Sequence, residues 1–130
     1  MKKILFLLTV LIGLGITAKS QTPPQFKFIT ETHNFGKIKK NKPVTVVFRF
    51  TNIGETPLII TDAQADCGCT TPVLNPTKGT PIKKGESGTV KVTYDAASIG
   101  TFTKNVTLTA NTKEKTKVIS LKGEVLNTTK

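Results

Sequence analysis

The sequence predicts an all-β fold, an antiparallel β-sandwich of about seven short strands formed by one domain. Two observations predict it. Apolar and polar side chains alternate with a period of two in several segments, most clearly over Val44–Thr51. Clusters of Gly, Pro and Asn separate these segments, and no window of residues 21–130 shows a helical period. Short strands at regular spacing are typical of two packed antiparallel sheets.

Each strand follows from its own pattern along the chain. A first strand begins at Phe26 and Phe28, and Leu58–Ala65 forms a more continuous apolar strand. The remaining strands are rich in Val and Thr, as strands prefer, and cover residues 44–51, 90–94, 105–110 and 119–125. Turn signals lie at residues 34–36, 39–43, 52–57, 83–86, 98–100 and 111–113. The longest irregular stretch is Asp66–Gly85, where we expect function because long loops in compact domains are commonly functional.

Residues 1–20 have the pattern of a secretory signal. Two basic residues precede an apolar run over residues 4–16, and Ala18 and Ser20 place small side chains where a signal peptidase needs them. The apolar run of about 13 residues is shorter than the roughly 20 that span a bilayer as a helix. We therefore expect a single mature domain over residues 21–130, exported to the periplasm or cell surface, with no membrane span.

The charge of the chain limits its partners. The full chain carries a formal net charge of +11, and +8 remains when Lys2, Lys3 and Lys19 leave with the signal. The lysines are scattered and Arg49 is the only arginine, whereas nucleic-acid readers depend on arginine and on aromatic stacking. We therefore expect no nucleic-acid binding, and an attraction to anionic envelope components instead.

The two cysteines stand in the segment Asp66-Cys67-Gly68-Cys69-Thr70-Thr71-Pro72. In an extended strand, residues two apart lie near the upper end of the Cα distances of about 4.4–6.8 Å that a disulfide allows. Gly68 can bend the chain to close that distance. A three-residue loop would contribute only roughly 1.6 kcal/mol of chain entropy, so Cys67 and Cys69 would form a weak and easily reduced staple.

A metal or catalytic role for these cysteines has less support in the sequence. Two thiolates could hold Cu(I) or supply half of a zinc site, but His33 is the only histidine and Met1 the only methionine. No hydrolase or kinase motif is present, and His33 has no catalytic partner in any motif. We therefore expect a non-enzymatic protein without a cofactor. Three interpretations stay open, in this order of preference: a structural or locally disulfide-bonded loop, a redox pair and a metal-binding pair.

Together the motifs resemble the bacterial family known as domain of unknown function 1573. The resemblance runs over about residues 26–125. It is carried by Phe48-Arg-Phe-Thr-Asn-Ile-Gly54, by the loop signature Asp66-Cys67-Gly68-Cys69-Thr70 with Pro72, by Pro81–Glu86 and by Gly100-Thr-Phe102. Asp66 departs from the family, which often has serine there. The resemblance implies an exported immunoglobulin-like sandwich, common in Bacteroidetes, and more distantly it extends to ciliary and sperm-protein domains. The family has no established reaction.

These observations predict an exported binding or scaffold module. The partner we expect is another envelope or surface protein, contacted through a sheet edge or through the Asp66–Gly85 loop, because open edges pair readily with a partner strand. The alternative is a redox or Cu(I)/Zn-binding protein that uses Cys67 and Cys69. The sequence specifies neither the partner nor the oligomeric state.

Overall fold

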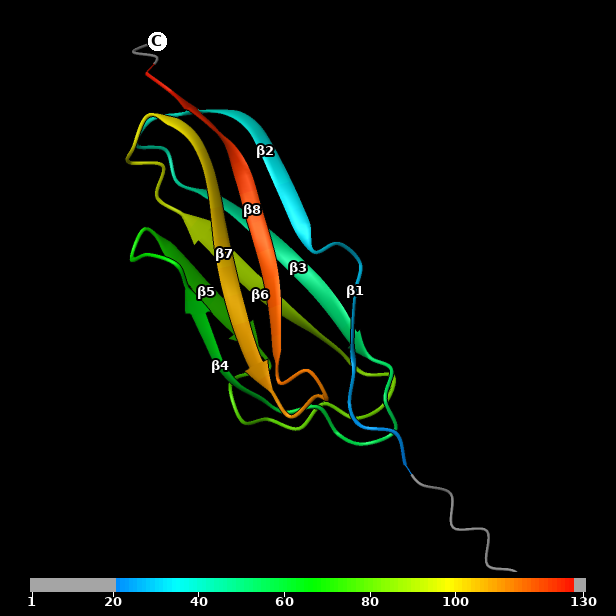
Figure 1. The fold of residues 1–130 in the computed structure, drawn as a ribbon. Helices are drawn as coiled ribbons and strands as arrows, with labels where there is room; N and C mark the ends of the chain where they lie inside the picture. The colour runs from blue at the N-terminus through cyan, green and yellow to red at the C-terminus, as the bar shows by residue number, and fades with distance from the viewer. Residues whose placement is uncertain (1–20, 128–130) are drawn as a thin grey trace, which may run out of the picture.

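The computed structural model describes residues 21–127, which form two four-stranded sheets packed face to face (Figure 1). One sheet has the strand order β1-β3-β6-β5 and the other β2-β8-β7-β4. All paired strands are antiparallel except β2 and β8, which are parallel. The eight strands are β1 (Phe26–Phe28), β2 (Thr32–Lys39), β3 (Val44–Asn52), β4 (Ile60–Ala65), β5 (Thr70–Asn75), β6 (Ser87–Tyr94), β7 (Gly100–Ala110) and β8 (Thr116–Leu126).

The predicted all-β sandwich is confirmed, with eight strands in place of about seven. The expected signal at residues 1–20 lies outside the described residues. Between residues 21 and 127, no helix has the length and apolar character needed to cross a membrane.

The strand β2 contradicts the turn predicted at residues 34–36. Asn34 Oδ1 accepts a hydrogen bond from the Gly36 backbone N–H at 2.9 Å, and Gly36 has φ +70°. The register of β2 against β8 shifts between Asn34 and Lys37. The turn chemistry is therefore real, but it forms a bulge inside a continuous strand.

The strand β5 contradicts the long irregular loop predicted over Asp66–Gly85. β5 lies at the edge of its sheet and pairs only with β6. Pro72 is tolerated within it because a strand edge leaves alternate N–H groups unpaired. The cysteines consequently lie in a four-residue connection between β4 and β5. β4 itself begins at Ile60, since Leu58 forms an isolated bridge with Ile82.

The core lies between the sheets and consists of the alternating apolar side chains that predicted the strands. Tyr94 stacks on Phe102 with ring centroids 4.3 Å apart, which joins β6 to β7 across the sandwich. Each fully buried large side chain contributes about 1.5–3 kcal/mol relative to an exposed one. The largest of them are Phe48, Phe50, Leu58, Leu108, Ile119 and Leu121.

Asn52, at the end of β3, is a fully buried polar side chain. Its Oδ1 accepts hydrogen bonds from the backbone N–H groups of Gln25 and Gly54, at 3.2 and 3.0 Å. Its Nδ2 donates to the carbonyls of Thr56 and Ile82, both at 2.9 Å. One amide thus bonds four backbone groups and ties together three segments of the chain, and the Asn-x-Gly motif has a structural role here.

Gly54 is required by the same junction. A Cβ at this position would lie 2.1 Å from the Pro23 carbonyl oxygen. Next to it, the Glu55 N–H donates to Thr22 Oγ1 at 3.0 Å. The segment before β1 therefore packs directly on the turn after β3, and only glycine leaves room for it.

Candidate functional site

The connection from Asp66 to Cys69 carries the chain from one sheet to the other. Cys67 and Cys69 are bonded to each other through their sulfurs, with Cα atoms 5.2 Å apart. In a straight strand the Cα atoms of residues two apart would be about 6.6 Å from each other, so the chain bends at Gly68. Both cysteines are half-buried and Gly68 is exposed. The disulfide therefore lies at the surface, at one end of the sandwich.

Backbone hydrogen bonds hold this connection at both ends. The Asp66 N–H donates to the Asn105 carbonyl at 3.0 Å, and the Asn105 N–H donates to Asp66 Oδ2 at 2.9 Å. On the other side, the Asp95 N–H donates to the Cys69 carbonyl at 2.9 Å. The carboxylate of Asp66 is thus part of the attachment to β7. The connection is anchored to both sheets independently of the disulfide.

In the described part of the chain, the hydrogen-bonding contacts of the two sulfurs are made by one hydroxyl. Thr70 is buried, and its Oγ1 lies 3.6 Å from Cys69 Sγ and 3.9 Å from Cys67 Sγ. Over residues 21–127, no three His, Cys, Asp or Glu side chains are grouped to hold a metal ion. His33 is not brought to the cysteines, because it lies in β2 at the opposite edge of its sheet and packs against Phe35.

A groove runs between β4 and β5, beside the disulfide connection. β4 is the edge of one sheet and β5 the edge of the other, and the two lie on the same side of the sandwich. The groove has a volume of about 290 Å³. Four of its six lining residues are apolar, but its walls expose polar and apolar atoms in similar amounts. The lining residues are Ala63, Pro72, Val73, Leu74, Thr77 and Lys78. Sequence reasoning missed this groove, since it required β5 to be recognised as a strand.

The two edges that border the groove differ in their free hydrogen-bonding groups. The Cys69 carbonyl accepts a hydrogen bond from the Asp95 N–H, so the backbone groups of Cys69 face the β6 side. Backbone groups alternate in direction along a strand, so those of Pro72 face the free edge, and Pro72 has no N–H to offer there. The Asp66 N–H donates to the Asn105 carbonyl of β7. By the same alternation, the backbone groups of Ala63 and Ala65 point away from β7, toward the free edge of β4. β4 therefore presents paired donors and acceptors to the outside, whereas β5 is interrupted.

The remaining two edges carry features that hinder strand addition. β1 has only three residues. β2 contains the bulge at Gly36 and two exposed lysines, Lys37 and Lys39. Short strands, bulges and lysines are the devices by which proteins protect sheet edges. In β4 the register shift falls at its start, between Ile60 and Asp62, so the stretch from Asp62 to Ala65 stays regular.

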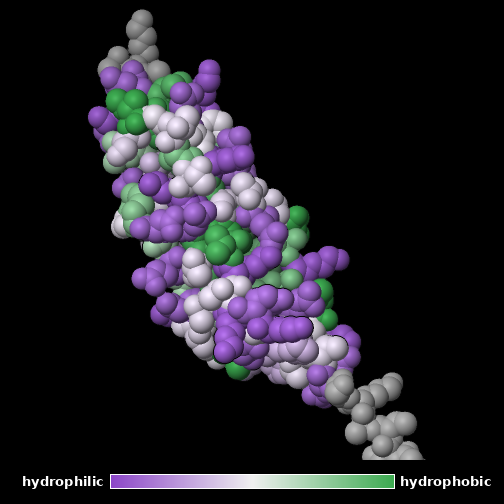
Figure 2. All heavy atoms as spheres, in the orientation of Figure 1, coloured by the Kyte–Doolittle hydropathy of each residue, from purple (hydrophilic) through white to green (hydrophobic). Residues whose placement is uncertain are grey.

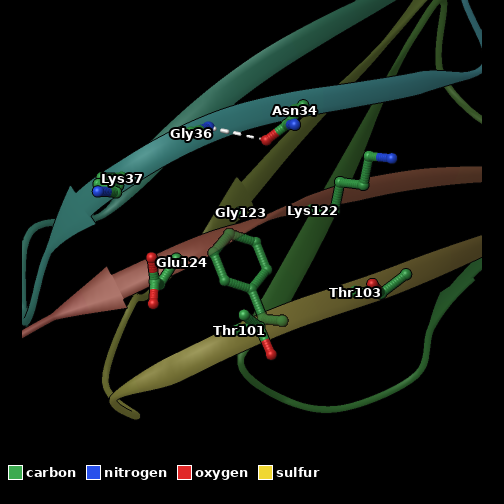
Figure 3. Close-up of a pocket in the computed structure, with 9 residues that line it drawn as sticks. Asn34, Gly36, Lys37, Thr101, Thr103, Lys122, Gly123 and Glu124 are labelled. Carbon is green, nitrogen blue, oxygen red and sulfur yellow. Dashed lines mark hydrogen bonds between the residues drawn. The ribbon is translucent and has the colours of Figure 1, made fainter.

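A second hollow of about 380 Å³, with polar and apolar atoms in its lining, lies on the face formed by β2, β8 and β7 (Figure 3). Gly36 and Gly123 form part of its floor, and a Cβ on Gly123 would lie 2.8 Å from the Gly36 carbonyl oxygen. Lys37, Lys122 and Glu124 border it, so it carries charges of both signs. Figure 2 shows the same mixed character, with hydrophilic side chains over this face and small hydrophobic spots among them. The hollow favours neither an anion nor a cation.

Solved structures with this fold come from diverse proteins. A Porphyromonas gingivalis W83 protein of unknown function superimposes with a TM-score of 0.68 at 18% identity, covering 85% of this chain and 51% of that one. The chain thus spans about half the length of that protein. The ASH/PapD-like domain 7 of human CEP192 matches with a TM-score of 0.65 at 8% identity, covering 88% and 94%. The Vibrio cholerae VesB protease matches with a TM-score of 0.55 at 16% identity, and the match covers 78% of this chain but only 31% of the protease.

These identities establish a shared fold and nothing further. A search among curated proteins finds no match. The family of proteins of unknown function DUF1573 matches residues 26–125, which include the Asn52 junction, both cysteines and all eight strands except the last residue of β8. This chain belongs to the DUF1573 family.

Proposed function

We propose that the protein is an exported, non-enzymatic binding or scaffold module of the bacterial envelope that docks another envelope protein along β4. The observation that carries the proposal is the groove between β4 and β5, which has aliphatic side chains in its walls and is bordered by a strand edge with free backbone groups. An extended peptide that adds to a sheet edge gains main-chain hydrogen bonds, and pockets for alternate side chains give specificity.

The side chains of the groove fit this mode of docking. Ala63 and Ala65 are small and half-buried, so an added strand meets no bulky side chain beside β4. Pro72 and Leu74 are half-buried on the opposite wall and leave apolar surface for every second side chain of the partner. The partner segment we expect is extended, with aliphatic residues at alternate positions.

Export is supported by the signal pattern in residues 1–20 and by the disulfide. Disulfides persist in oxidising compartments such as the bacterial periplasm and are rare in the cytosol. The Cys67–Cys69 bond therefore suits the envelope. Cell fractionation with a C-terminal tag tests this part of the proposal, and recovery of the protein in the cytosolic fraction with residues 1–20 intact would refute it.

In-cell photo-crosslinking tests the docking site. A photoreactive residue at Thr77, which lines the groove, is expected to crosslink to an envelope protein, whereas one at the exposed Lys113 is not. Ala63→Pro removes an outward N–H and is expected to abolish the Thr77 product while the protein stays folded. A crosslink that persists unchanged in Ala63→Pro would show that the partner does not add to β4.

A thiol function is the second candidate, and the surface position of the disulfide favours it. A thiolate from a small thiol or a partner cysteine would attack one sulfur, form a mixed disulfide and release the other sulfur as a thiolate. A second thiol would then release the bound one and leave both cysteines reduced. The Thr70 hydroxyl is close enough to donate to the released thiolate. Equilibration in glutathione buffers tests this candidate, and Cu(I) or Zn(II) titration of reduced wild type against Cys67→Ser/Cys69→Ser tests the metal-binding form.

A further inference from the structure

The outer face of the β1-β3-β6-β5 sheet has a charge of one sign. The four strands contain no Asp or Glu, whereas Lys27, Arg49 and Lys91 all lie on them and are exposed. The other sheet carries acidic and basic residues together. We propose that this outer face, defined by Lys27, Val47, Arg49, Val73 and Lys91, docks an acidic surface of a partner protein.

Apolar side chains lie among these positive charges. Val47, Lys91 and Val73 are aligned in one row across β3, β6 and β5. Val47 is 50% exposed and Val73 is 55% exposed. Ile29, 78% exposed, follows β1 and donates its N–H to the Arg49 carbonyl, which places it beside Arg49 on the same sheet. The face therefore combines aliphatic contact surface with cations, and not cations alone.

The hydroxyl groups of this face are largely paired with one another. Thr45 and Thr93 share a hydrogen bond of 2.9 Å across β3 and β6, and Thr51 and Ser87 share one of 3.0 Å. Covering a polar group that already has a partner costs less than covering one that depends on water. The face can consequently be dehydrated by a partner with a small penalty.

The chemistry of the face selects a protein among the anionic partners. Outward positions on these strands carry no aromatic side chain. Trp and Tyr anchor proteins at membrane interfaces, so the face lacks the means to insert among lipids. A phosphate-rich or glycan surface would leave Val47 and Val73 without apolar contacts. An acidic protein surface with aliphatic residues between its carboxylates would satisfy both kinds of side chain.

A second copy of this chain does not fit as the occupant. Two such faces in contact would bring like charges together, which costs several kcal/mol. The opposite sheet of another copy is not acidic. Two carboxylates at or beside that sheet already have cationic neighbours: Glu31 pairs with Lys117, and Asp62 lies 4.0 Å from Lys78.

The size of the face predicts a weak interaction. The four strands contain 26 residues in all, and with about 3.3 Å per residue and about 4.8 Å between strands they give a projected area of roughly 400 Å². Stable complexes bury about 800 Å² per partner. We therefore expect a transient contact that weakens as salt screens the charges. It is a surface distinct from the β4 edge, with Val73 at the border of the two, and it does not depend on docking at β4.

An NMR titration with poly-L-glutamate tests the proposal on the purified protein. Amide shifts are expected to cluster at Val47, Val73 and Lys91, and to shrink when salt rises from about 50 to about 300 mM. Ala63→Pro is expected to leave this titration unchanged, which separates the face from the β4 edge. Shifts centred on the β2-β8-β7 face, or no binding at the lower salt, would overturn the proposal.

Two matched charge reversals and one apolar change refine the test. Arg49→Glu/Lys91→Glu is expected to weaken binding on the order of tenfold or more. Lys37→Glu/Lys122→Glu, with the same change in net charge on the other face, is expected to change it less than about twofold. Equal effects of the two pairs would show attraction by net charge alone. Tighter binding to phosphatidylglycerol vesicles than to poly-L-glutamate, or self-association of the protein alone, would also contradict the proposal.

Val47→Ser/Val73→Ser separates the apolar contribution. With a partner protein it is expected to weaken binding by an amount that salt does not change, while poly-L-glutamate binding stays within about twofold because its carboxylates gain little from aliphatic contacts. A loss of poly-L-glutamate binding in this variant as large as that of the charge reversal would refute the separation of roles.

Discussion

The two sides of the sandwich are built differently. On one side a single segment, residues 26–39, pairs first with β3 as β1 and then with β8 as β2, so it serves both sheets in turn (Figure 1). Backbone bonds continue through the switch, from Ile29 to Arg49 and from Ser120 to Glu31. On the other side β4 and β5 face each other as separate edges across a groove. One side, the closed side, is thus held together by backbone hydrogen bonds of a shared segment, whereas on the other, open side the two sheets end in separate edges.

The closed side depends most on Asn52, and its loss gives the largest expected effect. Asn52→Ala leaves three backbone groups at the junction without partners, the N–H groups of Gln25 and Gly54 and the Thr56 carbonyl, whereas the Ile82 carbonyl keeps its bond from the Leu58 N–H. At about 1 kcal/mol each, we expect a loss of about 3 kcal/mol of unfolding free energy. Urea denaturation measures it. The control is Asn111→Ala, because Asn111 also bridges two backbone segments but is exposed. Equal losses of unfolding free energy in both variants would mean that the burial of Asn52 does not add to the stabilisation by its hydrogen bonds.

A pair of proline substitutions in β4 sharpens the comparison at the open side. Gln64→Pro removes an N–H that faces β7 and is expected to cost about 2–3 kcal/mol. Ala63→Pro removes an N–H that faces the free edge and is expected to cost less than about 1 kcal/mol. Thermal unfolding compares the two. A larger loss for Ala63→Pro would show that the backbone groups of Ala63 do not point outward.

The sequence was sufficient for the architecture and insufficient for the open side. Alternation in β3 and β6 predicted the sheets because these central strands bury one face each, which is the condition that makes the pattern visible. β2 and β5 escaped prediction since edge strands tolerate bulges and proline, and Gly36 and Pro72 read as turn residues. The groove depends on which two edges meet in space, and no local pattern encodes that. The cysteine motif could be located, but its anchoring by Asn105 and Asp95 could not.

The disulfide is expected to contribute less than the hydrogen bonds around it. Cys67→Ser/Cys69→Ser should fold and lose at most about 2 kcal/mol, because the closed loop is minimal and Asp66 and Cys69 are held by backbone bonds to both sheets. Chemical denaturation of the variant and of reduced wild type should give matching curves. Global unfolding of the double variant would instead show that the disulfide is the main stabilising bond of the open side.

The smallest expected effect is a pH dependence at Tyr94, which pairs with Thr70 in register near the disulfide connection. Burial, with a smaller contribution from the negative charge of Asp95, raises the pKa of the Tyr94 phenol above its usual value near 10. The unfolded chain therefore loses this proton at lower pH than the folded protein. Stability from this group is complete below about pH 10 and falls as pH rises from there toward the pKa in the folded state.

Tyr94 is the only tyrosine, so phenolate absorbance reports this group alone. In wild type, titration of the phenol is expected to lower the unfolding free energy by at most about 1.4 kcal/mol per pH unit, and Tyr94→Phe is expected to lack this part of the loss. Lysine titration remains in both proteins. The raised pKa arises because Tyr94 is packed between the sheets against Phe102 at the end of the core next to the open side. If wild type and Tyr94→Phe decline equally above about pH 10, the phenol titrates as freely in the folded protein as in the unfolded chain, and the open side is looser around Tyr94 than its packing indicates.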